Sequence, residues 1–282
     1  MNLEKTVKKA SQILKNHNIY SHELDAQIIL SDIMGIEREF LITNNEINIS
    51  EKVVKKYDIA IRRRIKREPV AYITGKKEFW SENFAVNYAT LIPRPETELL
   101  IYKVIDLFKN KRINILDIGT GTGCILLSIL KELNFARGTG IDISSKAIET
   151  AKINSKNLNL FSRSQFKVVD LNKFNTGKYD FIVSNPPYIP SRDIKNLSKD
   201  IIHYEPKIAL DGGIDGLDLI KKIIYKSKYL LKRNGLLALE IGFNQYPKVS
   251  NILRHHRFRE MSKEYDYNRN VRCIISTKVD FF

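Results

Sequence analysis

The stretch Ile115-Leu116-Asp117-Ile118-Gly119-Thr120-Gly121-Thr122-Gly123 decides the fold of this chain. The apolar run over residues 113–118 predicts a buried strand, and residues 124–133 predict a helix directly after the glycines. Three glycines at alternate positions let the backbone pass close to a ligand and leave helix N–H groups pointing outward. Strand and helix patterns continue to alternate after this turn, which indicates an α/β fold with a parallel sheet.

An acidic residue ends the next predicted strand, Gly138 to Ile141. Asp142 follows Gly123 by about 20 residues, the separation at which a carboxylate can accept both hydroxyls of a ribose. The loop spacing is Gly-x-Gly-x-Gly, and neither Gly-x-Gly-x-x-Gly nor Gly-Lys-Ser/Thr is present in it. This combination favours an adenosyl ligand without phosphates, and S-adenosylmethionine fits that description.

The motif Asn185-Pro186-Pro187-Tyr188 follows another apolar run, residues 179–184, which predicts a buried strand ended by a rigid turn. The two prolines fix two φ angles and remove two N–H donors, so their carbonyl groups remain as acceptors. Asn185 adds a side-chain carbonyl oxygen. Such acceptors can hold a planar NH2 group and aim its nitrogen at an electrophile. The alternative is an Asn-Pro turn that only reverses the chain, and the upstream glycine loop argues against it.

The chain before residue 68 has the pattern of a helical module. Apolar residues at helical spacing predict helices from the N-terminus to His17, from Ser21 to Gly35, and from about Val53 to the residues before Pro69. The basic run 62–67 would surround most of a helix, so we expect a solvated helix end rather than a surface that binds a nucleic-acid groove. The module either docks a macromolecular partner or only supports the fold.

The remaining segments complete the expected architecture. Short strands are predicted at 79–80, 84–86 and 91–92, with a turn at 81–83 and a helix after Pro95; this segment either forms a pocket wall or only leads into the helix. Toward the C-terminus we expect a helix at 216–231, a strand at 235–241, a helix at 245–256 and an antiparallel pair at 264–267 and 271–277. Glu240 ends a strand near the expected pocket, and we do not expect it to contact substrate.

Composition sets outer limits on function. The chain has 282 residues, 43% hydrophobic, and a net charge of +15. No apolar stretch reaches about 18 residues and no signal-peptide pattern opens the sequence, so we expect a soluble, cytoplasmic protein without membrane association. The two distant cysteines argue against a disulfide framework and a zinc site, and no metal is expected. The charge suggests proximity to ribosomal RNA or its partners, although lysine is abundant throughout the chain.

Several motifs together resemble one enzyme family along nearly the whole chain. The glycine loop and Asp142 look like the cofactor motifs of class I methyltransferases, and Asn185 to Tyr188 looks like the signature of those that methylate planar nitrogens. More specific similarity to the release factor glutamine methyltransferase (PrmC/HemK) family comes from the segments 68–75, 78–80, 91–98 and 205–217. The most distinctive of these are the Arg-Pro-Glu-Thr-Glu block, residues 94–98, and the helical N-terminal module.

The resemblance implies an α/β, Rossmann-like class I methyltransferase fold with a mostly parallel seven-stranded sheet. It implies a small helical N-terminal domain at 1–75 that docks release factors, a β-hairpin linker at 76–95 and an S-adenosylmethionine-binding domain at 96–282. The implied reaction is methylation of the glutamine side-chain amide in the Gly-Gly-Gln motif of class-1 peptide chain release factors, by a monomeric enzyme.

Site residues carry over by motif position. The residues implied to contact the cofactor are Gly119, Thr120, Gly121, Thr122, Gly123, Asp142, Leu171 and Asn185. Those implied to bind the glutamine are Asn185, Pro186, Pro187 and Tyr188, with Asn185 and Pro186 supplying the catalytic acceptors. Leu171 stands where many members have an aromatic residue near the adenine, so an apolar contact would replace aromatic stacking.

Two other functions are compatible with parts of this pattern. An aminomethyltransferase acting on adenine or guanine in RNA or DNA would use the same Asn-Pro-Pro-Tyr grip. The net charge favours this alternative slightly, whereas the absence of a clear groove-reading domain disfavours it. A non-catalytic binding protein on a degenerate methyltransferase fold is the other alternative, and the intact glycine loop, Asp142 and Asn185 argue against it.

Overall fold

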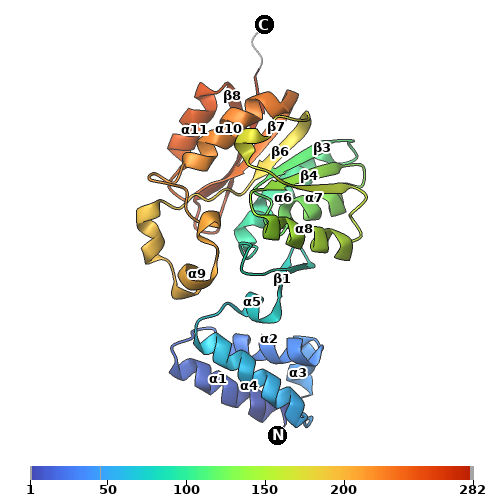
Figure 1. The fold of residues 1–282 in the computed structure, drawn as a ribbon, viewed down its shortest axis with the longest axis vertical. Helices are drawn as coiled ribbons and strands as arrows, with labels where there is room; N and C mark the ends of the chain where they lie inside the picture. The colour runs from blue at the N-terminus through green and yellow to red at the C-terminus, as the bar shows by residue number, and fades with distance from the viewer. Residues whose placement is uncertain (1, 45, 280–282) are drawn as a thin grey trace. The chain divides into compact units, whose positions relative to one another are not determined.

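The structure, a computed structural model, describes residues 2–44 and 46–279 and divides the chain into two compact units. The helical unit comprises Met1–Lys76 together with Ser198–Tyr204, and the sheet unit comprises Lys77–Leu197 and Glu205–Phe282 (Figure 1). The helical unit therefore includes a short segment from far downstream in the sequence.

Helices make up the helical unit. They are α1 (Leu3–Asn16), α2 (His22–Met34), α3 (Arg38–Thr43), α4 (Glu51–Ile65), α5 (Val70–Thr74) and α9 (Lys199–Tyr204). The three long predicted helices correspond to α1, α2 and α4, while the short α3, α5 and α9 were not predicted. Side chains cap two of the long helices, since the backbone N–H of Lys5 donates to Asn2 and that of Val53 donates to Ser50.

The basic run 62–67 is only partly solvated, so the prediction of a solvated helix end is wrong for one of its residues. Arg64 is 6% exposed and donates from its guanidinium to Asp25 and Asp200, each at 2.7 Å. In the same unit, the hydroxyl of Tyr204 donates to the backbone carbonyl of Lys66. Periodicity within α4 could not reveal these partners because Asp200 lies more than a hundred residues downstream.

A seven-stranded sheet organises the second unit. Its strands are β3 (Asn114–Ile118), β4 (Arg137–Asp142), β5 (Ser164–Val168), β6 (Tyr179–Ser184), β7 (Leu231–Glu240), β8 (Phe258–Tyr265) and β9 (Val271–Lys278). Their order is β5-β4-β3-β6-β7-β9-β8, with parallel pairing from β5 to β7 and antiparallel pairing on both sides of β9. The predicted mostly parallel seven-stranded sheet is confirmed.

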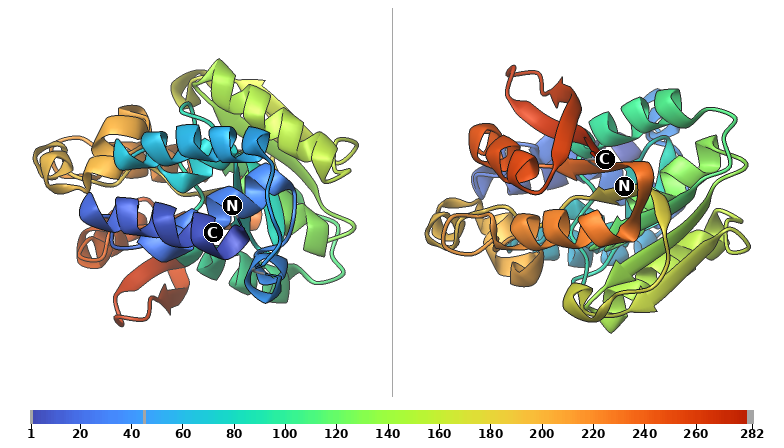
Figure 2. Two further views of the ribbon diagram at one scale, coloured as in Figure 1. Left: turned by 90° about the horizontal axis from the view of Figure 1, so that it is seen from below. Right: turned by 90° about the horizontal axis from the view of Figure 1, so that it is seen from above.

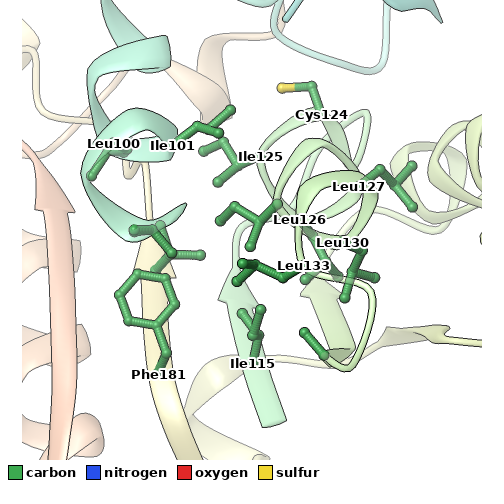
Figure 3. Packing of buried hydrophobic residues seen from close by; sticks show 14 of the residues in the cluster. Leu100, Ile101, Ile115, Cys124, Ile125, Leu126, Leu127, Leu130, Leu133 and Phe181 are labelled. Carbon is green, nitrogen blue, oxygen red and sulfur yellow. The ribbon is translucent and has the colours of Figure 1, made fainter. Parts of the chain in front are cut away.

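Two helical layers cover the sheet (Figures 1 and 2). A separate cluster of buried hydrophobic residues lies between the sheet and each layer. One layer contains α6 (Glu98–Phe108), α7 (Cys124–Glu132) and α8 (Ser145–Asn157), and the other contains α10 (Asp218–Leu230) and α11 (Tyr246–His255). Figure 3 shows Leu100 and Leu126 from the first layer packed over Ile115 and Phe181 of the strands. All four side chains are fully buried, and each contributes roughly 1.5–3 kcal/mol through removal from water.

Short helices of one or two turns, all 3-10 in type, occupy the connections. They are η1 (Pro95–Thr97), η2 (Leu171–Lys173), η3 (Ser191–Asn196) and η4 (Lys207–Ala209). No helix in the described part of the chain combines the length and the apolar character that crossing a bilayer requires.

A small hairpin precedes the sheet, formed by β1 (Lys76–Phe79) and β2 (Glu82–Ala85). Its two-residue turn is Trp80-Ser81, with φ angles of 51° and 57°, which is the type I′ geometry that matches the twist of a hairpin. The predicted turn at 81–83 is therefore displaced, and the predicted strand at 91–92 is an irregular segment. A positive φ angle is unusual for a bulky residue such as Trp80, so the sequence does not indicate a turn at this position.

The other differences between the predicted and the observed strands occur at the edges of the sheet. The last antiparallel pair contains β8 at Phe258–Tyr265 rather than 264–267, and β5 was not predicted as a strand. Both strands lie at the edges of the sheet and carry many polar residues, with burial in β8 alternating along the strand. Such strands bury little apolar surface, so their sequences resemble loops.

Candidate cofactor and substrate site

A pocket of about 740 Å³ lies at the carboxyl ends of the parallel strands. The chain order reverses between β3 and β6, and open α/β sheets bind ligands in the crevice beyond the strand ends at such a point. The predicted site residues that line the pocket are Gly119, Thr120, Gly121, Thr122, Asp142, Leu171, Asn185 and Pro187. Gly123, Pro186 and Tyr188 lie beside these residues in sequence but do not line it.

The glycine loop has the open backbone that its sequence predicts. Gly119 and Gly121 have φ angles of 73° and 55°, which favour glycine, and a Cβ on either would meet no atom within 4 Å. The amides of Gly119 and Thr120 both donate to the carbonyl of Ile141, which fixes the loop against β4. Gly123 also has a positive φ angle, but it faces the packed side chains of the helix layer. The open space is therefore on the pocket side of the first two glycines.

Asp142 lines the pocket beside the glycine loop. Its carboxylate accepts the amide of Gly121 at 3.0 Å and the amide of Ser144 at 2.9 Å. A carboxylate has about four lone-pair sites, so these two bonds leave acceptor capacity for ligand hydroxyls. A direct hydrogen bond thus joins the glycine loop to Asp142, and a ribose hydroxyl at Asp142 would lie beside the glycine backbone.

A second carboxyl group lies under the same loop. Asp117 is 1% exposed, and one of its oxygens accepts the hydroxyl of Thr120 at 2.6 Å. Its other oxygen has no partner among the described residues. Burial and the neighbouring charge of Asp142 raise the pKa of Asp117 to about 7, and the Thr120 hydrogen bond opposes this shift. A buried, incompletely satisfied carboxyl group beside an open glycine loop fits a cationic adenosyl ligand such as S-adenosylmethionine.

The segment before α6 forms one wall of the pocket, which is the functional alternative predicted for it. Residues 89–94 and Thr97 line the cavity. Arg94 donates to the buried carboxylate of Glu205 at 2.5 Å, and Glu98 accepts the backbone amide of Trp80 at 2.9 Å. Residues of the Arg-Pro-Glu-Thr-Glu block therefore hold this wall to the rest of the sheet unit.

Asn185 enters the pocket from the end of β6 with its side-chain orientation fixed. The hydroxyl of the preceding Ser184 donates to the carbonyl of Ile118 at 2.6 Å, which ties the ends of β6 and β3 together. The Nδ2 atom of Asn185 donates to Thr97 Oγ1 at 3.1 Å, and Thr97 in turn donates to Glu240 at 2.6 Å. No residue in the described ranges donates a hydrogen bond to Asn185 Oδ1.

The ring of Tyr188 lies against Arg272 of β9. The guanidinium carbon is 5.4 Å from the ring centroid, and Arg272 donates to the tyrosine hydroxyl at 2.9 Å. That hydroxyl donates to Glu240 at 3.3 Å. Burial raises the pKa of Tyr188 to about 12, and burial likewise raises the pKa of Glu240.

The sequence places Glu240 near the expected pocket, but it does not predict the hydrogen bonds that join Glu240 to Thr97 and to Tyr188, or the contact of Arg272 with Tyr188. The available signal was a lone acid, Glu240, at the end of the apolar strand 236–241. A buried carboxylate requires hydrogen-bond partners, but the strand pattern does not show where those partners lie.

Two family profiles match the chain. The profile described as "PrmC N-terminal domain" matches residues 5–75, and that described as "Methyltransferase domain" matches residues 109–269. Among solved structures, the ribosomal protein L11 methylase of Lactobacillus delbrueckii subsp. bulgaricus superposes with a TM-score of 0.50 at 21% identity. That alignment covers 67% of this chain and 82% of the methylase chain, and it supports the fold alone.

Curated relatives match over nearly the full length of this chain. The release factor glutamine methyltransferase of Clostridium acetobutylicum is 40% identical over 99% of both chains. That of Buchnera aphidicola subsp. Acyrthosiphon pisum is 38% identical over 99% of this chain and 100% of its own. A bifunctional methyltransferase of Rickettsia conorii is 34% identical over 99% of this chain and 58% of its own length. The identity and coverage of these matches, together with the pocket geometry, place this chain in the release factor glutamine methyltransferase family.

Proposed function

We propose that this protein transfers a methyl group from S-adenosylmethionine to the side-chain amide nitrogen of the glutamine in the Gly-Gly-Gln motif of class-1 peptide chain release factors. The observation that carries the proposal is one pocket that joins the glycine loop and Asp142 to Asn185. Membership in the family supplies the substrate class. The nucleic-acid alternative, which the net charge favours slightly, is weakened because the helical unit buries Arg64 of its densest basic run.

The cofactor fits the loop side of the pocket. Backbone of Gly119 to Gly121 would lie against the ligand, Asp142 would accept the ribose hydroxyls, and Leu171 would provide an apolar contact for the adenine. When bound, S-adenosylmethionine supplies a methyl group on a positively charged sulfur. Transfer forms a carbon–nitrogen bond, breaks the carbon–sulfur bond and releases one proton from the amide nitrogen.

The acceptor side has to overcome the low nucleophilicity of an amide, whose nitrogen lone pair is delocalised into the carbonyl. Asn185 Oδ1, which lines the pocket, accepts one hydrogen of the glutamine NH2 group. The carbonyl of Pro186, a residue beside the lining in sequence but not part of it, is the acceptor proposed for the other hydrogen, and the two together fix the plane of the amide. Positive charge develops on the nitrogen during transfer, so these acceptors stabilise the transition state more than the ground state. Water can accept the proton afterwards, and the reaction therefore needs no strong base in the pocket.

The helical unit is proposed to dock the release factor. It exposes large apolar side chains to solvent, among them Phe40, Ile42 and Ile59. Exposed apolar groups mark protein interaction surfaces when they gather. A cytoplasmic, monomeric enzyme that meets its substrate near the ribosome is part of the same proposal.

Methyl-transfer assays test the proposal directly. The full-length protein is incubated with methyl-labelled S-adenosylmethionine and, in parallel, with a purified class-1 release factor, the same factor with its Gly-Gly-Gln glutamine replaced by asparagine, and total RNA. We expect label only on the unmodified factor. Label on RNA alone would overturn the proposal in favour of the aminomethyltransferase alternative.

Docking is tested with variants at exposed positions of the helical unit. Ile42→Ser and Ile59→Ser should raise the KM for a whole release factor and leave the rate with a short Gly-Gly-Gln peptide unchanged. Exposed Lys152→Ser on α8 of the sheet unit serves as the control. Equal KM values for all these proteins would show that the helical unit does not dock the substrate through these side chains.

A further inference from the structure

The buried carboxylate of Glu240 ends a chain of hydrogen bonds that leads to the pocket. Glu240 is 1% exposed at the carboxyl end of β7, and Thr97 of η1 is 2% exposed. The distances are 2.6 Å from Thr97 Oγ1 to Glu240 Oε2 and 3.1 Å from Asn185 Nδ2 to Thr97 Oγ1. Three segments that are distant in sequence thus meet at one hydroxyl.

The hydrogen bonds can run in only one direction when Glu240 is ionised. A carboxylate only accepts hydrogen bonds, so the single hydroxyl proton of Thr97 is committed to Glu240. The Thr97 oxygen is then available only as an acceptor, and the atom of Asn185 beside it has to be the NH2 group. This assignment leaves Asn185 Oδ1 for the pocket that Asn185 lines.

The other carboxylate oxygen of Glu240, Oε1, also accepts a hydrogen bond from a hydroxyl group, that of Tyr188. Arginine has only donors, and Arg272 donates to the Tyr188 oxygen at 2.9 Å, so the Tyr188 proton can point to Glu240 Oε1 at 3.3 Å. The Arg272 guanidinium is itself 3.9 Å from that carboxylate oxygen. Burial raises the pKa of Glu240, whereas the hydrogen bond from Thr97, the charge of Arg272 and the hydrogen bond from Tyr188 lower it. These three partners support the ionised carboxylate on which the direction of the hydrogen bonds depends.

The geometry points to Thr97 and Glu240, supported by Arg272, as positioning residues that set the orientation of the Asn185 amide and thereby select an NH2-bearing methyl acceptor. This inference rests on the proposed function for the identity of the acceptor. In the opposite orientation, Asn185 would present its own NH2 group to the substrate NH2 group. Two donors facing each other leave both groups unsatisfied, and binding of a primary amide would be lost.

The hydrogen bonds from Asn185 to Thr97 and from Thr97 to Glu240, called the relay below, lead to specific predictions for conservative substitutions. Thr97→Val has nearly the same shape and no hydroxyl, so the Asn185 amide loses its orienting acceptor. Glu240→Gln can place an NH2 group against Thr97, which frees the threonine proton to donate to Asn185 and favours the flipped amide. Thr97→Ser keeps the hydroxyl and should restore most of the activity.

A matched control exists at the far edge of the same sheet. Glu260 of β8 accepts the hydroxyls of Tyr246 and Ser250 on α11, so it is also a glutamate held by two hydroxyl donors. Glu260→Gln perturbs a similar polar cluster that does not line the pocket. It should therefore leave both methyl transfer and cofactor binding at the wild-type level.

The experiment measures methyl transfer to a class-1 release factor, S-adenosylmethionine affinity by calorimetry and melting temperature for the full-length wild type and the four variants. We expect Thr97→Val and Glu240→Gln to lower kcat on the order of 10–100-fold, the range for misplacing a reacting group, with cofactor affinity within about threefold. Thr97→Ser and Glu260→Gln should stay within about threefold of wild-type kcat, a difference below about 1 kcal/mol.

A readout that does not depend on turnover separates this inference from the proposed function. The side-chain ¹⁵N–¹H signals of Asn185, assigned by their loss in Asn185→Asp, should shift in Thr97→Val and Glu240→Gln but not in Glu260→Gln. The relay would be overturned if the Asn185 signals did not shift in Thr97→Val and Glu240→Gln, or if Thr97→Val kept the wild-type kcat. It would also be overturned if these variants lost cofactor affinity and melting temperature together with kcat. A wild-type protein that does not methylate release factor would overturn the proposed function, while the Asn185 signals would still decide the orientation.

Discussion

Arg64 in α4 and Asp200 in α9 form an ion pair of 2.7 Å across 136 positions of the sequence. Asp200 lies only a short distance after the Asn-Pro-Pro-Tyr motif, yet its segment Ser198–Tyr204 belongs to the helical unit. The chain thus leaves the sheet unit after the Asn-Pro-Pro-Tyr motif, contributes α9 to the helical unit and returns at Glu205. Within the helical unit, α9 is held by the buried charge of Arg64.

The first prediction concerns this charge. Arg64→Met removes the cation that Asp25 and Asp200 share and leaves their carboxylates uncompensated in a mostly buried site. Breaking a buried pair in this way costs about 3–5 kcal/mol, so the free energy of unfolding of the helical unit should fall by a comparable amount. Chemical denaturation followed by circular dichroism measures it.

Arg62→Met, on the exposed side of the same helix, provides the control and should change stability by less than about 0.5 kcal/mol. Equal stability of the two variants would contradict the structural role assigned to Arg64.

A second prediction concerns Asp142. Its replacement by alanine removes the acceptor proposed for the ribose and frees the amides of Gly121 and Ser144. S-adenosylmethionine affinity should weaken by about 1–3 kcal/mol, the cost of leaving hydrogen-bonding partners unpaired. Isothermal titration calorimetry gives the dissociation constant.

Asp180→Ala is the matched control for Asp142→Ala. Asp180 also accepts a backbone amide, that of Asn114 at 2.8 Å, but it does not line the pocket. Cofactor affinity should be unchanged in this variant. Unchanged affinity in Asp142→Ala as well would remove Asp142 from the cofactor site.

The third prediction is a pH dependence of cofactor binding. The folded-state pKa of Asp117 is raised to about 7, first by burial and also by the charge of Asp142. The ionised form attracts a cationic ligand, so affinity should increase as the pH rises from 6 to 8 and binding should release protons. Calorimetry in buffers of different ionisation enthalpy measures the proton release.

Asp117→Asn cannot ionise, so it should flatten this pH dependence between pH 6 and 8. A wild-type affinity that is constant over the interval, or that decreases with pH, would show that Asp117 does not couple to the ligand.

Much of the sheet unit was predictable because its signals are local. The glycine loop, Asp142 and Asn185 each follow an apolar strand, and parallel strands bring their carboxyl ends to one edge of the sheet. The loop conformation also follows directly from sequence, since positive φ angles at Gly119 and Gly121 require glycine.

Long-range polar pairing could not be predicted from the same signals. Thr97 opens a helix in the sequence pattern, whereas its structural role is to join Asn185 to Glu240. Arg64 lies on the same face of α4 as the buried Tyr57 and Ile61, but the sequence does not show that Asp200 supplies the charge that a buried arginine needs. A hydrogen bond between distant segments leaves no periodicity in either one, so only the folded structure shows it.

The role of Asn185 in catalysis is tested by the rate of methyl transfer to the Gly-Gly-Gln glutamine of a class-1 release factor by wild type, Asn185→Asp and Asn185→Ala, with the modified residue located by mass spectrometry. We expect methylation of that glutamine by the wild type and a loss on the order of 10²-fold or more in Asn185→Ala, as expected for removing a transition-state hydrogen bond. Asn185→Asp should fall in between, because it keeps an acceptor oxygen but loses the NH2 group that Thr97 holds. Melting temperatures should be nearly unchanged. Wild-type turnover in Asn185→Ala, or unfolding of either variant, would contradict the assignment of Asn185 as the group that holds the methyl acceptor.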